Sequence, residues 1–273
     1  MRIQDEILVL KMLIQLNPKQ AKLRAKLQEY FEGVMTTALK AELNDPKHLI
    51  DFYISLGFDS IFLRPVNYMG FARKNFKELS NEIDRWNKFY EESINYIIKI
   101  NESTYFEEFH FSLLLKNIVQ LQNRGFVDFR SPSFFLQDYG VIDFDGKIYP
   151  SDEARMLSRT KHVDLSVGAL GGSLDTNKIN ELNWSSMNQV EPDCLHCVYM
   201  PFCGIDIIDD MSRYNRVDSP KLDSWFCRRH MSTFDLIFNK IESRNVEWLD
   251  VFLKWIYQSK NPPKTYEIFY DRS

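Results

Sequence analysis

Cysteine is absent from the first two thirds of this 273-residue chain, and the sequence also lacks long apolar stretches, an apolar signal segment and a strong positive charge. The chain has no stretch of about 18 or more apolar residues, so we expect no membrane span. The residues after Met1 are polar and charged and do not form the apolar core of a secretory signal, so we expect a cytoplasmic protein. A net charge of -4 gives no broad positive field, which argues against a nucleic-acid partner.

The composition is that of a globular protein. Hydrophobic residues make up 44% of the chain, which is enough to bury a sizeable core, and the length suits one large or two small domains. Within residues 1–33, apolar residues recur at spacings of three and four on both sides of Pro18. This pattern predicts two helices that pack as a hairpin.

After residue 33 the pattern changes to alternating strands and helices. Residues 34–39 and 60–66 predict strands; Asp45 and Pro46 predict the start of a helix that ends at Gly57. A long amphipathic helix is predicted from about Phe76 to Ile100. This order indicates parallel strands in one sheet. Arg64, at the end of the second strand, either faces a ligand at the carboxyl edge of the sheet or forms a structural ion pair.

A hairpin is predicted around Asp145-Gly146, between residues 141–144 and 147–149. Asp152 and Arg155 are expected to cap and pair at the start of the next helix. The acidic group of Asp143, Asp145, Asp152 and Glu153 could be read as a general acid or a cation site, but turn and cap roles explain it more simply.

The segment Gly168 to Ser173, GALGGS, predicts a bend and not a phosphate loop, because no Gly-Lys-Ser/Thr follows it. Helices are predicted over residues 176–184, 231–241 and 246–257. Their large apolar side chains are expected mostly in the core: Phe234, Ile237, Phe238, Trp248, Phe252 and Trp255.

The four cysteines are Cys194, Cys197, Cys203 and Cys227, with the spacing C-x2-C-x5-C-x23-C. Four thiolates can completely enclose one zinc ion or one [4Fe-4S] cubane, with no coordination position left for a substrate. Closely spaced thiols in a reducing cytoplasm favour metal or redox chemistry over disulfides. The spacing therefore predicts a closed metal centre, with a free structural thiol as the alternative for Cys227 alone.

The spacing also bears on which metal is bound. Zinc fingers and ribbons usually have two close cysteine pairs, whereas this chain has one close pair and two isolated cysteines, which favours the cubane over zinc. His196 and His230 lie near the cysteines in sequence, but four thiolates already complete the ligand shell, so both are expected outside it. His48, His110 and His162 have no ligand spacing and are expected to be structural.

Three segments together resemble a known family. They are LIDFYISLGFDSIFLRPVNYMGFA (49–72), DFDGKIYPSDEARML (143–157) and CLHCVYMPFCG (194–204). In this order they resemble the later part of radical S-adenosylmethionine enzymes with a SPASM domain, and look most like the peptide-modifying maturase of the His-Xaa-Ser system. The resemblance spans roughly residues 34–240, and its most specific part is the cysteine segment.

The resemblance implies that Cys194, Cys197, Cys203 and Cys227 hold an auxiliary [4Fe-4S] cluster. Pro201 and Gly204, on either side of the third cysteine, also fit the family pattern. Many relatives have further cysteines four residues after the third and near the YP-D segment, which serve a second auxiliary cluster. This chain has Ile207 and Ser151 at those positions, so one auxiliary cluster is expected.

The chain departs from the family in having no C-x3-C-x2-C loop. In the family, that loop leaves one iron open for S-adenosylmethionine. We therefore expect no catalysis of its reductive cleavage by this chain alone. Two explanations remain: half of a split enzyme, completed by a polypeptide that brings the catalytic cluster, or a degenerate relative retained for binding.

The sequence thus predicts an α/β protein with a partial (β/α) barrel-like parallel layer. The expected parts are a helical hairpin (1–33), the barrel-like region (34–140), a SPASM-like four-cysteine module (141–240), and a C-terminal helix and tail (241–273). The leading hypothesis is a non-catalytic or split-enzyme component of a radical S-adenosylmethionine peptide-modifying system that binds a protein or peptide partner. The competing hypothesis is a zinc-stabilised interaction module without a redox role.

Overall fold

The computed structural model describes residues 34–38, 45–66, 68–70, 73, 83–120, 131 and 133–270. Over these residues the protein is a mixed α/β structure, mostly helical, with two small sheets. The helical hairpin predicted for residues 1–33 lies outside the described residues. Within the described part, no helix combines the length and apolar character needed to cross a membrane.

The first sheet is parallel and has the order β1-β2-β3, formed by Val34–Ala38, Ser60–Pro65 and Glu107–Glu108. Helix α3, Pro46–Ser55, connects β1 to β2. Asp45 caps α3, because its side chain accepts a hydrogen bond from the His48 amide, and Pro46 occupies the first turn. Gly57 follows the helix with φ +82°, a conformation that glycine adopts without strain. The predicted parallel strand-helix-strand unit is therefore confirmed.

Two helices follow, α5 (Ile83–Ile100) and α6 (Phe109–Gln120). Residues 74–82 lie outside the described residues, so the first turns predicted for α5 are not covered. Neither β3 nor α6 was predicted from the sequence. Strand β3 consists of two glutamates, Glu107 and Glu108, which are nevertheless buried.

The larger core packs these elements against the two C-terminal helices α11 (Trp225–Glu242) and α12 (Val246–Tyr257). Helix α5 contacts α3 and α11, and α6 contacts β2 and α12. The largest fully buried side chains of this core come from all of these segments: Ile50, Ile61, Leu63, Phe89, Phe106, Phe111, Phe234, Phe252 and Trp255. Phe234, Ile237, Trp248, Phe252 and Trp255 are buried as predicted, and Phe238 is partly buried against the same core.

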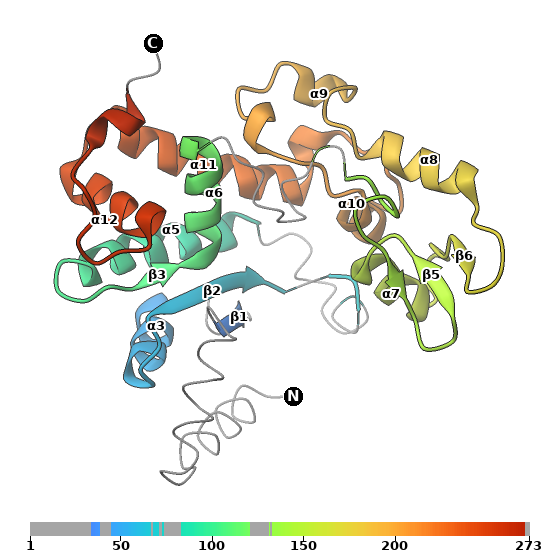
Figure 1. Cartoon of the computed structure of the whole chain (residues 1–273), viewed down its shortest axis with the longest axis horizontal. Helices are drawn as coiled ribbons and strands as arrows, with labels where there is room; N and C mark the ends of the chain where they lie inside the picture. Colours follow the sequence, from blue (N-terminus) through green and yellow to red (C-terminus); the bar gives the residue numbers. More distant parts are fainter. Residues whose placement is uncertain are drawn as a thin grey trace, which may run out of the picture.

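The second sheet is antiparallel, with strands β4 (Val141–Ile142), β5 (Lys147–Tyr149) and β6 (Gly168–Ala169). The predicted hairpin is confirmed, with Gly146 at φ +80° in its turn. The prediction for residues 168–173 was incomplete, because Gly168 and Ala169 pair with β5 before the bend. Figure 1 shows this sheet at one end of the molecule and the parallel sheet towards the other.

Helix α7, Asp152–Arg159, follows the hairpin. The expectation that Asp152 caps it was wrong: Ser151 is the cap, and its hydroxyl accepts from the Ala154 amide at 3.2 Å. Ser151 has extended backbone and precedes the helix, as a cap requires, whereas Asp152 is already the first helical residue. The predicted pairing of Arg155 with Asp152 is present at 2.6 Å. Asp143 accepts from Arg159 at 2.6 Å, so the acidic group is tied into the hairpin and α7, as the turn interpretation predicted.

The remaining elements are short: α8 (Thr176–Ser185), α9 (Pro192–Leu195), η4 (Met200–Phe202), α10 (Ile207–Tyr214), η5 (Lys221–Asp223) and η6 (Tyr266–Phe269). Three of the cysteines lie on or beside two of them, α9 and η4. Helix α11 starts six residues earlier than the predicted residue 231, because Ser224 caps it by accepting from the Cys227 amide at 3.1 Å. Cys227 therefore lies in the first turn of a long, buried helix.

Candidate metal centre and the neighbouring cavity

The four cysteines line one cavity, which we call the cysteine cavity. Cys194 is in α9, Cys197 follows it, Cys203 follows η4, and Cys227 is in α11. The volume is about 40 Å³, and much of the remaining wall is apolar, with Ile205, Phe226, Met231 and Phe234. The fold thus brings together thiols that are separated by up to 33 positions in sequence.

The thiols are close enough to influence one another. All four are free, and burial, reinforced by Glu191 and Cys197, raises the pKa of Cys194 to about 11. Burial raises the pKa of Cys227 to about 12, and the charges of Cys194 and Cys197 add to this shift. Burial also raises the pKa of Cys203, where Cys227 contributes the largest of the added charge effects. Among the described residues, no group of three or more His, Cys, Asp or Glu is arranged to hold a single metal ion.

Two asparagines from distant parts of the chain hold the segment between the second and third cysteines. Asn188 is buried, and its side-chain amide donates to the carbonyls of Met200 at 3.0 Å and Cys203 at 2.8 Å. Asn117 of α6 donates to the Phe202 carbonyl at 3.2 Å. These hydrogen bonds fix the backbone that presents Cys203. Nothing in the local sequence around either asparagine indicated this role.

Replacing Asn188 with alanine should lower the free energy of unfolding by about 2 kcal/mol, because two part-buried carbonyl groups lose the donor that a buried side chain gives them. Chemical denaturation of Asn188→Ala measures this loss. Gln189→Ala is the matched control, since Gln189 is exposed and should change the free energy by less than about 0.5 kcal/mol. Equal stability of the two variants would contradict a role of the Asn188 hydrogen bonds in holding this segment.

A buried ion pair lies beside the thiols. The Lys221 ammonium donates to Asp210 Oδ2 at 2.6 Å and to the Val217 carbonyl at 2.7 Å, and both side chains of the pair are at most 5% exposed. The Lys221 amide donates to Asp193 at 2.7 Å, which ties α9 to η5. Lys221 and Asp210 both line the cysteine cavity. The pair is neutral as a whole: Lys221 opposes the burial that raises the pKa of Cys194, whereas Asp210 adds to the burial that raises the pKa of Cys227.

The histidines take different positions. His230 is buried, lines the cysteine cavity, and donates from Nδ1 to the Phe226 carbonyl at 2.9 Å. His196 is exposed. His110 is buried beside Tyr90, and His162 contacts the Met211 carbonyl.

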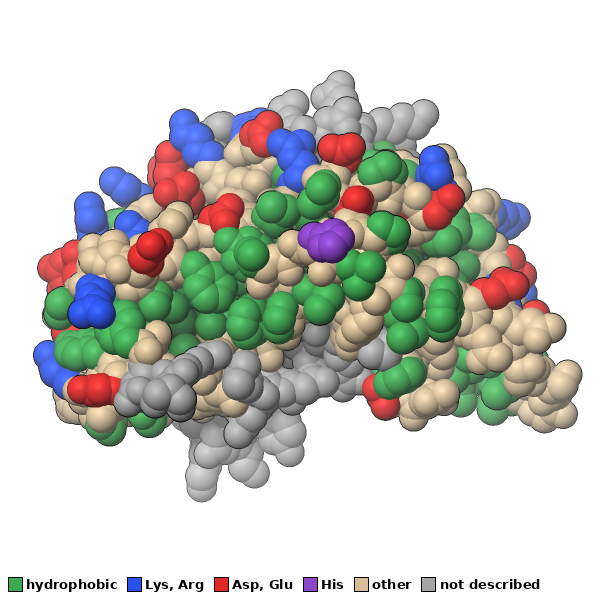
Figure 2. Space-filling view, turned by 90° about the horizontal axis from the view of Figure 1, so that it is seen from above, with side chains coloured by type: hydrophobic (Ala, Val, Ile, Leu, Met, Phe, Trp, Pro, Cys, Tyr) green, Lys and Arg blue, Asp and Glu red, His purple; other side chains and the backbone are tan. Residues whose placement is uncertain are grey.

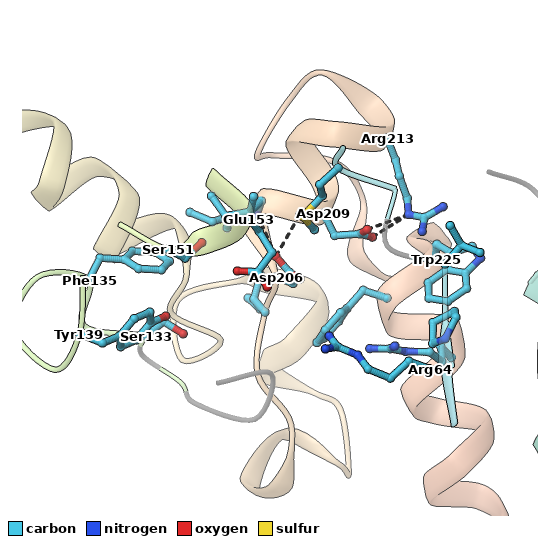
Figure 3. A pocket seen from close by; sticks show the side chains of 18 residues that line it. Arg64, Ser133, Phe135, Tyr139, Ser151, Glu153, Asp206, Asp209, Arg213 and Trp225 are labelled. Atoms are coloured by element: carbon cyan, nitrogen blue, oxygen red, sulfur yellow. Dashed lines mark hydrogen bonds and ion pairs between the residues drawn. The ribbon is translucent and has the colours of Figure 1, made fainter. Parts of the chain in front are cut away.

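A second cavity lies between the end of β2 and helices α7, α10 and α11 (Figure 3). We call it the sheet-edge cavity; its volume is about 90 Å³. Ser151 and Ile207, which stand where many members of the resembled family have further cysteines, both line it. Its charged lining residues are Arg64, Glu153, Asp206, Asp209, Arg213 and Arg229. Arg64 therefore lines a cavity at the carboxyl edge of the sheet; whether it faces a ligand there or forms a structural ion pair stays a prediction.

Comparison with known proteins supports the fold. No protein-family model matches the sequence, and no curated protein matches it. The structure is similar to that of native anSMEcpe with bound AdoMet and Kp18Cys peptide, with a TM-score of 0.55 and 14% identity over 84% of this chain and 62% of that chain. It is also similar to a polyhistidine-tagged form of anSMEcpe with bound AdoMet, with a TM-score of 0.56 and 13% identity over 88% of this chain and 62% of that chain.

The chain thus spans less than two thirds of anSMEcpe, a radical S-adenosylmethionine enzyme with a SPASM domain. At this level of identity the similarity concerns the fold, which resembles part of that enzyme.

Proposed function

We propose that this protein is the cluster-holding, partner-binding component of a radical S-adenosylmethionine peptide-modifying system. The observation that carries the proposal is that Cys194, Cys197, Cys203 and Cys227 line one cavity, within a fold similar to part of anSMEcpe. The anSMEcpe structure that holds a peptide supports the choice of a peptide or protein partner.

The residues around the cysteine cavity suit a closed iron–sulfur cluster. Four cysteines supply the full ligand set of a [4Fe-4S] cluster, a group that transfers single electrons when bound. The apolar wall limits access of water, and Asn188 and Asn117 fix the cysteine backbone. With all positions taken by cysteine, the chain itself offers no open iron for a substrate.

The partner is proposed to supply the catalytic half. The sequence contains no C-x3-C-x2-C segment, and the chain matches only 62% of anSMEcpe. In the described part of the parallel sheet, β1 is an outer strand that pairs with β2, so a strand from a partner could extend the sheet there. In this proposal, residues 34–140 form the barrel-like region, residues 141–240 form the four-cysteine module, and residues 241–273 form the C-terminal helix and tail.

Exposed apolar side chains near the cysteines are consistent with a protein partner. Leu195 is 50% exposed, Val198 77% and Leu222 50%. Figure 2 shows hydrophobic side chains gathered across one face of the molecule. Contiguous exposed apolar patches, unlike single exposed side chains, mark interaction surfaces.

Metal analysis tests the proposal. Protein purified anaerobically should contain about four iron atoms and about four sulfides per chain. One zinc per chain with no sulfide would overturn the cluster and support the alternative, a zinc-stabilised interaction module without a redox role. That alternative is favoured by the missing C-x3-C-x2-C loop, because a chain without the catalytic half does not need a redox centre.

A pull-down from the native host tests the partner. The split-enzyme proposal predicts capture of a polypeptide that carries C-x3-C-x2-C. Capture of only unrelated proteins, from lysates in which such a polypeptide is expressed, would contradict it.

A further inference from the structure

The side-chain amide of Asn188 has a fixed orientation at the wall of the cysteine cavity. Asn188 lines this cavity and is 2% exposed. Its amide nitrogen lies 3.0 Å from the Met200 carbonyl and 2.8 Å from the Cys203 carbonyl. A carbonyl can only accept a hydrogen bond, so the NH2 group must face these two carbonyls. The amide oxygen, Oδ1, is therefore directed away from them.

Asn188 Oδ1 is a buried acceptor that no donor among the described residues reaches. Three other side chains that line the cavity donate elsewhere: Tyr199 to Asp235, Lys221 to Asp210 and the Val217 carbonyl, and His230 to the Phe226 carbonyl. Buried polar atoms of folded proteins are nearly always paired, and ordered water pairs them where no protein group can. Asn188 Oδ1 thus requires a donor that the protein itself does not provide.

The cysteines cannot provide this donor once they bind a metal. In the metal-free structure the Cys203 thiol donates to the Gly204 carbonyl at 3.3 Å. Ligation removes the thiol protons, after which all four sulfurs can only accept hydrogen bonds. The loaded site would then contain sulfur acceptors and the Asn188 oxygen acceptor together. A molecule with two O–H groups can bridge such a pair, and water is the smallest of these.

The cavity limits the size of this molecule. Its volume of about 40 Å³ exceeds the roughly 10–15 Å³ that one water requires, and is far below the roughly 300–1,000 Å³ of pockets that enclose organic ligands. Much of the wall is apolar and offers a water no partner: Ile205, Phe226, Met231 and Phe234. The Asn188 oxygen and the sulfurs are polar partners in the same cavity.

We infer that one buried water joins Asn188 Oδ1 to a cysteine sulfur, and that Asn188 is thereby a positioning residue that sets the reduction potential of the centre. The inference rests on the proposed function, because it concerns the [4Fe-4S] cluster that the four cysteines would hold. A hydrogen bond to a ligand sulfur offsets part of the negative charge on it. Such a bond therefore favours the reduced cluster.

Pulsed electron paramagnetic resonance of the reduced, full-length protein tests for the water. Brief exchange into D2O labels a buried water, whereas the amide protons of the buried backbone exchange much more slowly. We expect a deuterium coupling to the cluster in the wild type. The coupling should be lost in Asn188→Leu, because leucine has a similar size but no acceptor to hold the water.

A redox titration measures the effect on the potential. At a fixed applied potential, the ratio of reduced to oxidised cluster in Asn188→Leu should be about tenfold lower than in the wild type, which corresponds to about 59 mV for one electron. Asn117→Ala is the matched control. Asn117 donates to the Phe202 carbonyl at 3.2 Å and so holds the same segment, but it does not line the cysteine cavity. This variant should keep the wild-type potential and the deuterium coupling.

Iron and sulfide, measured on the same samples, separate this inference from the proposed function. A wild-type protein with a full cluster and no deuterium coupling would overturn the water, and this result does not depend on the folding of any variant. Equal shifts of potential in Asn188→Leu and Asn117→Ala would overturn the positioning role, because loosening of the cysteine segment would then explain both. Absence of iron and sulfide from the wild type would contradict the proposed metal centre, and this inference with it.

Discussion

Replacing Cys203 with serine should abolish binding of the cluster and lower the melting temperature by about 10 °C. Cys203 lines the cysteine cavity together with the other three thiols, and a serine hydroxyl is a poor replacement for a thiolate ligand. The free energy of metal binding contributes directly to folding, and a loss of about 4 kcal/mol corresponds to a shift of this size in a chain of this length. Calorimetry under anaerobic conditions measures the melting temperature, and iron and sulfide analysis measures the cluster.

His196→Asn is the matched control for the serine variant. His196 lies between Cys194 and Cys197 but is exposed, so its loss should change neither the metal content nor the melting temperature. If Cys203→Ser kept the full metal content and the wild-type melting temperature, the four-cysteine centre would be wrong. If His196→Asn lost metal as well, the ligand set would have to include that histidine.

The second large effect concerns Glu108, whose ionisation should make stability fall as the pH rises towards neutrality. Glu108 is fully buried, and burial raises its pKa to about 7, although hydrogen bonds from Tyr90 and from backbone amides oppose the shift. The Tyr90 hydroxyl donates to Oε2 at 2.6 Å, the Phe111 amide to Oε2 at 2.6 Å, and the Leu63 amide to Oε1 at 2.9 Å. The side chain thus joins β2, α5 and the start of α6.

The sign of the pH dependence follows from the direction of the shift. The folded-state pKa of about 7 lies above the ordinary value of 4.5, so the folded protein binds this proton more tightly than the unfolded chain does. The stabilisation is fully present below about pH 4.5 and is lost as the pH rises through about 7. The total for this group is on the order of 3 kcal/mol.

Urea denaturation between about pH 5 and about pH 8, compared between the wild type and Glu108→Gln, measures this contribution. Buried His110 and His230 have lowered pKa values and contribute stability that is lost as the pH falls, but they do so in both proteins, so the difference isolates Glu108. Exposed Glu102→Gln is the control and should retain the wild-type pH dependence. A difference between the wild type and Glu108→Gln that does not vary with pH would contradict the assignment.

Several elements could be predicted because their signals are local. Asp45, Pro46 and Gly57 mark the two ends of α3, and Asp145-Gly146 marks the turn between β4 and β5. In each case the residue provides a cap, a fixed φ or a left-handed conformation at its own position. The end of the helix or the turn is therefore set by that residue type, with little influence from the rest of the fold.

The strand β3 and helix α6 could not be predicted for the opposite reason. Glu107 and Glu108 look like surface residues in the sequence, but Glu107 pairs with Lys116 at 3.4 Å and Glu108 receives donors from three separate segments. Burial of a carboxylate is tolerated only when such donors surround it, and their positions depend on the whole fold. The hydrogen bonds of Asn188 and Asn117 to the segment before Cys203 could not be predicted either, because the positions of these donors also depend on the whole fold.

The sequence by itself determined the parallel order of the first two strands, the hairpin, the apolar faces of the C-terminal helices and the identity of the four thiols, because these depend on local conformation, on periodicity or on residue type. Only the tertiary structure decided that those thiols share one cavity, that Lys221 and Asp210 lie beside them, and that Arg64 and Arg229 line a second cavity at the edge of the sheet. The residues of the cysteine cavity lie on several short elements and those of the second cavity come from both halves of the chain, and only packing of the core brings them within reach of one another.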